Sequence, residues 1–206
     1  MLERSFLANA IRVILRKSGY LAAAGWPRSA RLGEPVDARG MPIPWMTYPA
    51  VAFLEPRLKS SFRVFEYGSG NSTFWWAARV ARVDSCEHDS AWIARLQQRL
   101  PGNVRLRHVP LENGQYGTAV IEARGPFDLV VIDGRDRVNC AQNSVSVLGT
   151  HGVIVWDDTY RQEYEPGYES LRQAGFRRLD FHGLAPIMPN TSCTSIFYRD
   201  ENCLGI

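Results

Sequence analysis

The sequence predicts an α/β protein with a doubly wound, mostly parallel sheet. From residue 63 onward, short apolar runs of strand length alternate with segments of helical periodicity, a pattern typical of this architecture. The segment 127–132 is mostly apolar, as expected for a central parallel strand that is buried on both faces. The last two strand-like segments, 176–181 and 195–199, have no helix between them, which predicts an antiparallel last strand.

The N-terminal part is expected to form an arm in front of this sheet. Residues 4–18 carry apolar side chains at helical spacing and predict an amphipathic helix. Residues 25–49 contain five prolines and three glycines, which predict an irregular arm, either a packed extension or a lid on the substrate side. A short helix over 50–58 leads into the main domain. The expected division is therefore an arm, residues 1–60, and a ligand-binding domain, residues 61–206.

The main domain is expected to contain seven strands. They are predicted over 63–67, 83–87, 104–109, 127–132, 152–156, 176–181 and 195–199, and the helices over 72–82, 90–100, 136–148 and 169–174. Ligands of such a sheet bind at the carboxyl ends of the strands. The candidate functional residues are therefore sought where each strand ends.

Composition excludes several function classes. A formal charge of +3 with no clustered Lys/Arg block argues against a nucleic-acid partner. No run approaches the roughly 20 apolar residues that a membrane span requires. The N-terminal segment is interrupted by charges and is a poor signal peptide, so the cytoplasm is the expected location. None of the four cysteines forms a Cys-x-x-Cys pair, which fits buried thiols in a reducing compartment.

A glycine loop follows the first predicted strand, in the segment Glu66-Tyr67-Gly68-Ser69-Gly70-Asn71-Ser72-Thr73. Its glycines allow a ligand to approach the backbone, and the following helix offers free N–H groups. A dinucleotide fingerprint would place a third glycine where Thr73 stands, and a pyrophosphate disfavours a nearby carboxylate such as Glu66. The ammonium group of S-adenosylmethionine suits that carboxylate.

This segment resembles the first motif of the class I S-adenosylmethionine-dependent methyltransferases, acidic-x-Gly-x-Gly, and the resemblance covers about residues 63–199. It implies a Rossmann-like fold and a cofactor held by Glu66 and the loop residues Gly68, Ser69, Gly70 and Ser72. Glu87, about 20 residues further on, ends the second strand and is expected to accept both ribose hydroxyls. His88 is expected to line the adenine pocket.

Three carboxylates follow the fourth and fifth strands: Asp133, and the pair Asp157 and Asp158. Carboxylates that converge must be protonated, paired with arginine, or bound to a cation. Oxygen ligands of this kind suit Mg²⁺. The sequence leaves these three solutions open.

The same arrangement resembles the cation-dependent O-methyltransferases, in which an Asp after strand four and an acidic pair after strand five hold the metal. The resemblance implies Asp133, Asp157 and Asp158 as Mg²⁺ ligands, with Asp133 and Asp157 taking part in catalysis. It is partial, because Arg135 and Arg137 stand where a Lys is common. Asp133 is also expected to contact the cofactor, and it could instead hydrogen-bond the substrate or serve as the base.

The expected function is therefore S-adenosylmethionine-dependent O-methylation of a small-molecule or saccharide hydroxyl. The segments 44–49 and 183–189, which combine proline with apolar residues, are expected to border the acceptor pocket. Two alternatives stay open: a nicotinamide-dependent oxidoreductase, and a nucleoside-binding partner subunit without turnover. The sequence leaves the oligomeric state open, a homodimer included.

Overall fold

The structure is a computed structural model that describes residues 9, 16 and 19–206. Within these residues, seven strands form one sheet in the order β3-β2-β1-β4-β5-β7-β6. Only β7 runs antiparallel to its neighbours, as predicted. The strands are β1 (Arg63–Tyr67), β2 (Arg82–Glu87), β3 (Val104–His108), β4 (Phe127–Ile132), β5 (Leu148–Trp156), β6 (Arg177–Leu184) and β7 (Thr191–Tyr198).

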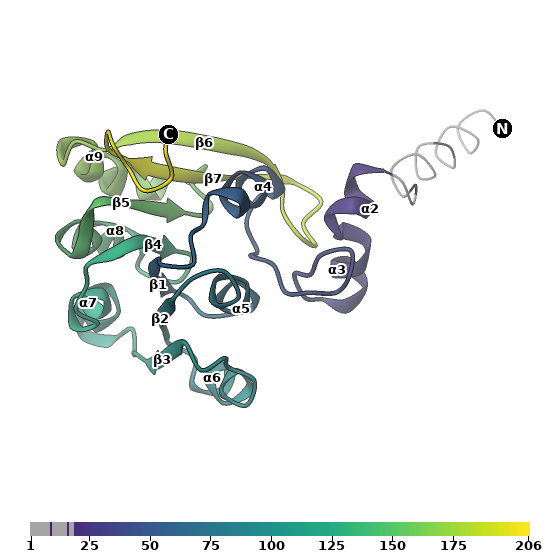
Figure 1. The fold of residues 1–206 in the computed structure, drawn as a ribbon, viewed down its shortest axis with the longest axis horizontal. Helices are drawn as coiled ribbons and strands as arrows, with labels where there is room; N and C mark the ends of the chain where they lie inside the picture. Colours follow the sequence, from purple (N-terminus) through teal and green to yellow (C-terminus); the bar gives the residue numbers. More distant parts are fainter. Residues whose placement is uncertain (1–8, 10–15, 17–18) are drawn as a thin grey trace.

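Helices cover both faces of the sheet (Figure 1). One face carries α4 (Tyr48–Leu54), α5 (Asn71–Ala77) and α6 (Ser90–Gln97), and the other carries α7 (Gln115–Glu122), α8 (Arg137–Ser144) and α9 (Glu165–Gln173). Trp75 and Trp76 of α5 pack in the first core, and Tyr116 of α7 packs in the second. The predicted doubly wound fold is confirmed. Among the described residues, no helix is both long enough and apolar enough to span a membrane.

The helix predicted over 72–82 is wrong at its end, because α5 stops at Ala77 and Arg82 already pairs with Arg63 of β1. The Asn103 amide explains the early stop. Its Nδ2 donates to the carbonyl oxygens of Ala77 at 2.9 Å and Val80 at 3.1 Å, which the helix itself leaves without partners. A side chain distant in sequence therefore ends the helix.

Helix α7 (Gln115–Glu122) was not predicted from the sequence. Its buried face consists of Tyr116, Gly117, Ala119 and Val120 and is too short to give a clear period. The helix predicted over 136–148 is also too long. It ends at Ser144, followed by the 3₁₀ turn η3 (Val145–Val147), and β5 starts at Leu148, which pairs with Phe127.

The arm is more regular than predicted. It contains α2 (Tyr20–Ala24) and α3 (Trp26–Leu32), and Pro27 is tolerated because it stands in the first turn of α3. The Ser29 hydroxyl donates to the Val36 carbonyl oxygen at 2.8 Å and accepts from the Val36 N–H at 3.0 Å, which folds the arm back on itself. The helix predicted over 50–58 begins at Tyr48 and continues into the 3₁₀ turn η1 (Glu55–Arg57). The helix predicted over 4–18 lies almost wholly outside the described residues.

Candidate active site

The glycine loop joins β1 to α5 where the strand order reverses. Gly68 has a φ of +85°, which L side chains rarely adopt. A Cβ built on Gly68 would lie 2.8 Å from the carbonyl oxygen of Asp133 and 2.8 Å from the Cα of Gly134. The loop after β1 and the loop after β4 are therefore in backbone contact, at the position where ligands of doubly wound sheets bind.

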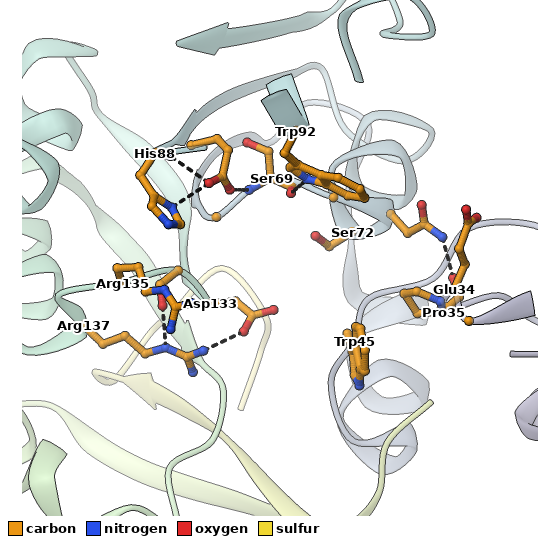
Figure 2. Close-up of a pocket in the computed structure, with 16 residues that line it drawn as sticks. Glu34, Pro35, Trp45, Ser69, Ser72, His88, Trp92, Asp133, Arg135 and Arg137 are labelled. Atoms are coloured by element: carbon orange, nitrogen blue, oxygen red, sulfur yellow. Dashed lines mark hydrogen bonds and ion pairs between the residues drawn. The ribbon is translucent and has the colours of Figure 1, made fainter. Parts of the chain in front are cut away.

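A cavity of about 380 Å³ opens beside this contact (Figure 2). Its volume lies within the range of small-molecule sites. Its walls come from the glycine loop, the end of β2, the start of α6, the loop after β4 and the arm. Seven residues that the sequence assigned to a cofactor lie in its lining: Gly68, Ser69, Gly70, Ser72, Glu87, His88 and Asp133.

Glu87 ends β2 with its carboxylate held by backbone donors. Its Oε2 accepts from the Ser69 N–H at 3.1 Å, and its Oε1 accepts from the N–H groups of His88 at 2.7 Å and Asp89 at 2.9 Å. These bonds fix the orientation of the carboxyl group at the cavity wall. Glu87 therefore also ties the glycine loop to β2.

Glu66 is fully buried below the loop and lies outside the cavity lining. Its Oε2 accepts from the Thr73 hydroxyl at 2.5 Å and the Ser85 hydroxyl at 3.1 Å. Burial raises the pKa of Glu66 to about 7. Its Oε1 is buried without a hydrogen-bond partner among the described residues. The contact between Glu66 and the cofactor ammonium stays a prediction, and the observed role of the side chain is to join β1, β2 and α5.

Asp133 lines the cavity directly after β4. Its Oδ1 accepts from Nη2 of Arg137 at 3.1 Å, and Nε of Arg137 donates to the Gly134 carbonyl oxygen at 3.0 Å. Burial raises the pKa of Asp133 to about 6, although Arg137 acts in the opposite direction. A carboxylate with this pKa is mostly ionised at neutral pH and suited to accept a proton.

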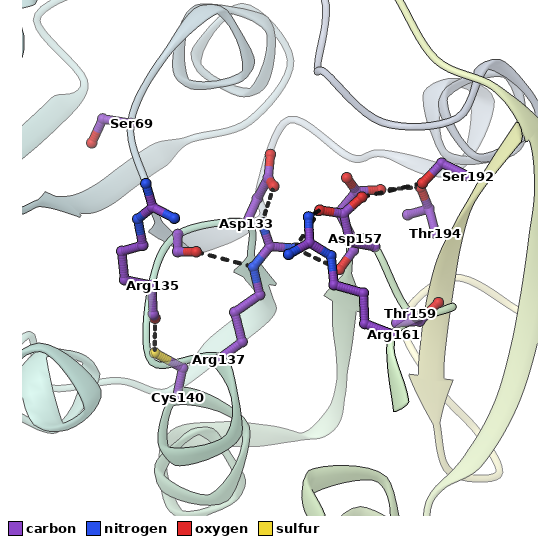
Figure 3. A network of polar contacts seen from close by, with 12 residues as sticks. Ser69, Asp133, Arg135, Arg137, Cys140, Asp157, Thr159, Arg161, Ser192 and Thr194 are labelled. Carbon is purple, nitrogen blue, oxygen red and sulfur yellow. Dashed lines mark hydrogen bonds and ion pairs between the residues drawn. The ribbon is translucent and has the colours of Figure 1, made fainter. Parts of the chain in front are cut away.

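Asp157 and Asp158 follow β5 and lie outside the cavity lining. Figure 3 shows Asp157 beside Thr194. Asp157 is buried and accepts a hydrogen bond from the Thr194 hydroxyl on β7. Burial, and then the charges of Asp133 and Asp158, raise the pKa of Asp157 well above its ordinary value. Asp158 pairs with Arg161 at 2.9 Å and lies 3.5 Å from Nη1 of Arg137.

The predicted Mg²⁺ site does not fit this arrangement. The guanidinium of Arg137 contacts the carboxylates of Asp133 and Asp158, and Arg161 also pairs with Asp158, so cations of the chain already stand beside two of the three carboxylates. The Asp157 carboxyl hydrogen-bonds to Thr194 instead, and its raised pKa favours the neutral form. Among the residues that the structure describes, the three carboxylates do not form a group whose oxygens all lie within 4.8 Å of one another. Arginine pairing is what the structure shows for Asp133 and Asp158, and Mg²⁺ gains no support.

The cavity lining also contains residues without a predicted role. Trp92 of α6 donates from Nε1 to the Ser69 carbonyl oxygen at 2.8 Å and so holds the glycine loop from outside. Arg135 extends from the loop after β4 toward Ser69 (Figure 3). The arm contributes Trp45, from a segment predicted to border the acceptor, whereas residues 183–189 do not line the cavity. From the sequence alone, a Trp that lines a cavity cannot be told from a Trp that packs in the core.

Comparison with known proteins gives the class of this fold. Residues 65–159 match the family model of a methyltransferase domain. No curated protein matches the chain. Among solved structures, a precorrin-6y C5,15-methyltransferase from Geobacter metallireducens GS-15 is similar, with a TM-score of 0.58 and 15% identity over 73% of this chain and 87% of that chain.

Two further solved structures share the fold. An rRNA methylase from Streptococcus thermophilus has a TM-score of 0.57 and 18% identity, covering 73% of this chain and 96% of that chain. A Streptococcus mutans protein in complex with S-adenosylhomocysteine has a TM-score of 0.52 and 14% identity, covering 73% of this chain and 97% of that chain. Because these structures are only 14–18% identical in sequence to this chain, they show a shared fold and nothing finer.

The fold is that of the class I, Rossmann-like methyltransferases. It is defined by the strand order of the sheet, which reverses between β1 and β4, and by the match to a methyltransferase domain. The match of residues 65–159 to a methyltransferase domain and the shared fold agree with the resemblance seen in the glycine loop. These findings support S-adenosylmethionine-dependent methylation as the class of activity.

Proposed function

We propose that the chain transfers a methyl group from S-adenosylmethionine to a hydroxyl oxygen of a small molecule or saccharide. The observation that carries this proposal is the placement of the glycine loop, Glu87 and Asp133 around one cavity of about 380 Å³. S-adenosylmethionine, when bound, supplies an electrophilic methyl group. The chain has to orient the acceptor oxygen and remove its proton.

The cofactor fits the donors and acceptors of this cavity. Glu87 presents a carboxylate whose orientation is fixed by three N–H groups, as an acceptor for the ribose hydroxyls requires. A Cβ built on Gly70 would meet no atom within 4 Å, which leaves space over the loop backbone. Glu66 lies under the loop, outside the cavity lining, with its Oε1 unpartnered among the described residues, and we propose that the ammonium group binds above it. His88 and Trp92 line the cavity together with Glu87, and we propose this part of the cavity for the adenine.

Asp133 is proposed as the base for the acceptor hydroxyl. It alone of the three clustered aspartates lines the cavity, and Arg137 holds its Oδ1. Asp157, which hydrogen-bonds to Thr194, is proposed as a positioning residue that fixes β7 beside the site. The arm, within residues 1–60, forms the wall opposite Asp133 through Glu34, Pro35 and Trp45 (Figure 2).

A nucleic-acid acceptor is less well supported. Arg137 and Arg161, two of the guanidinium groups beside the site, are paired with carboxylates. The exposed indole of Trp45 instead offers a flat apolar face to a sugar or phenol ring. The rRNA methylase among the similar structures shares the fold at 18% identity only.

The test combines ligand binding with methyl transfer. We expect calorimetry to show S-adenosylhomocysteine binding with micromolar-range affinity, about −8 kcal/mol, and far weaker NAD binding. Tighter binding of NAD would favour the oxidoreductase alternative. Binding of S-adenosylhomocysteine without methyl transfer to any member of a phenol and saccharide library would favour the partner subunit.

Asp133→Asn tests the base. We expect it to keep S-adenosylhomocysteine affinity and to slow methyl transfer by about 100-fold or more. The wild-type rate should fall as the pH falls through about 6, because protonation of Asp133 removes the base. Asp136→Asn is the matched control, since its exposed carboxylate accepts only from the Asn139 amide at 2.8 Å in the described structure. Full activity of Asp133→Asn would remove Asp133 from the mechanism.

A further inference from the structure

The hairpin of β6 and β7 brings together an Asp, a His and a Cys. His182 lies directly opposite Cys193 in the antiparallel register, and Asp180 lies two residues from His182, on the same face of β6. One ligand atom from each residue lies within 4.8 Å of the others, and Sγ of Cys193 is 3.8 Å from Nε2 of His182. Among the residues that the structure describes, this is the only group of three such side chains.

The spacing of the sulfur and the nitrogen is close to that of a tetrahedral metal centre. With Zn–S near 2.3 Å and Zn–N near 2.0–2.1 Å, a tetrahedral angle places the two ligand atoms about 3.6 Å apart. The observed separation of 3.8 Å therefore needs only a small side-chain adjustment. Thiolate and imidazole ligands select borderline-soft ions such as Zn²⁺ and Co²⁺ over Mg²⁺ or Ca²⁺.

Burial favours a metal ligand over a nucleophile at Cys193. The Cys193 side chain is fully buried, whereas His182 and Asp180 are exposed. A substrate cannot reach the sulfur, but an ion held at the protein surface by His182 and Asp180 can. Water can fill the fourth position from the solvent side.

The neighbours of Asp180 orient its carboxylate. Its Oδ1 accepts from Nε of Arg178 at 2.6 Å and from the Ser195 hydroxyl at 2.5 Å. Nη2 of Arg178 is itself bonded to the Thr159 carbonyl oxygen at 3.0 Å, so the guanidinium is anchored. Oδ2 has no hydrogen bond within the described residues and is the oxygen available to an ion. The contact with Arg178 is an ion pair, as at Asp133, but here His182 and Cys193 supply two further ligands that the aspartate cluster lacks. Metal-ligating carboxylates are themselves commonly hydrogen-bonded.

We propose that Asp180, His182 and Cys193 bind one zinc ion, with water as the fourth ligand. This inference concerns a different part of the chain from the candidate active site and does not rest on the proposed function. It has a structural consequence, because Ser192 and Thr194, on either side of Cys193, hydrogen-bond Asp158 and Asp157. A zinc ion would fix the strand that holds these carboxylates.

Cobalt is the spectroscopic probe for this site. The full chain, stripped with a chelator and kept reduced without oxygen, is titrated with Co²⁺. We expect one ion per chain, with visible bands of tetrahedral Co²⁺ and a thiolate-to-cobalt band in the near ultraviolet, all removed by Zn²⁺. Cys193→Ser should lose the thiolate band, and His182→Ala and Cys193→Ser should each weaken Co²⁺ binding by about 100-fold.

The chain offers a matched pair of controls. His151→Ala and Cys203→Ser remove another His and Cys, which lie near each other because the Cys203 N–H donates to the His151 carbonyl oxygen at 2.7 Å. Both controls should keep the cobalt spectrum. Absence of a thiolate band in excess Co²⁺, or a band that survives in Cys193→Ser, would overturn the proposal. His182→Ala changes an exposed side chain and keeps the test valid if Cys193→Ser unfolds.

Discussion

The contact between the glycine loop and the loop after β4 makes Gly68→Ala a sharp test of the site. At a φ of +85°, an alanine costs roughly 1–2 kcal/mol. Its Cβ would also meet backbone atoms of Asp133 and Gly134 at 2.8 Å. Relief of that overlap requires a backbone shift and costs about 1–3 kcal/mol more.

The expected loss in the free energy of unfolding is therefore about 2–5 kcal/mol. For a chain of this size, the thermal midpoint should fall by about 5–15 °C. Differential scanning calorimetry measures the midpoint, and isothermal titration measures S-adenosylhomocysteine affinity. We expect affinity to fall as well, because the shift displaces Asp133 and the loop together.

Gly70→Ala is the matched control for stability. Gly70 has an extended φ of −176°, and a Cβ there would meet no atom within 4 Å. The thermal midpoint of Gly70→Ala should stay near that of the wild type. The new methyl group would lie in the space that we propose for the cofactor, so S-adenosylhomocysteine affinity can fall without a loss of stability. If Gly68→Ala has the same thermal midpoint as the wild type, or if Gly68→Ala and Gly70→Ala lower the midpoint equally, the two loops are not in the contact described.

Two further predictions concern the buried glutamates. Glu87→Ala should weaken S-adenosylhomocysteine binding by about 1.5–3 kcal/mol in calorimetry and also lower the thermal midpoint, because three N–H groups lose their acceptor; unchanged affinity would place the ribose elsewhere. Burial raises the pKa of Glu66 from 4.5 to about 7, so the folded state holds a proton that the unfolded state releases between these values. Stability should therefore fall as the pH rises across this window, by up to about 3 kcal/mol, and Glu66→Gln should flatten that fall in urea unfolding at pH 5 and 8. Equal pH dependence in both proteins would contradict the assignment.

The central sheet could be predicted because its strands carry their own signal. The strands over 63–67 and 127–132 have the predicted bounds, since each is a short run of mostly buried residues. The glycine loop after β1 could also be predicted, because Gly68 has a φ of +85°, a backbone conformation that favours glycine. Helix ends were less predictable, since Asn103 ends α5 from 26 residues away in the sequence.

The neutralisation of the acidic cluster could not be read from the sequence. Arg137 reaches Asp133 from the start of α8, and that helix begins after Asp136 takes a φ of +49°. Nothing in the local pattern predicts this turn, so protonation, arginine pairing and a bound cation all remained open. Trp45 lies in a segment that was expected to border the acceptor, but Trp92 had no predicted place in the cavity lining.

The contacts of the arm with distant parts of the chain have a consequence for how the molecule is assembled during translation. The N–H of Thr47 donates to the Thr194 hydroxyl at 3.0 Å, the Thr47 hydroxyl donates to the Phe181 carbonyl oxygen at 3.0 Å, and the Trp26 indole donates to the Met188 carbonyl oxygen at 3.0 Å. The arm precedes these partners in the sequence, so it is synthesised well before the segments that hold it in place. The glycine loop and β1–β5 can pair as they leave the ribosome, whereas the wall that carries Trp45 must wait for β6 and β7. The cavity can therefore form completely only after the C-terminal strands have been synthesised. A chain truncated before β7 would lack Thr194, which accepts the hydrogen bond from Thr47 of the arm.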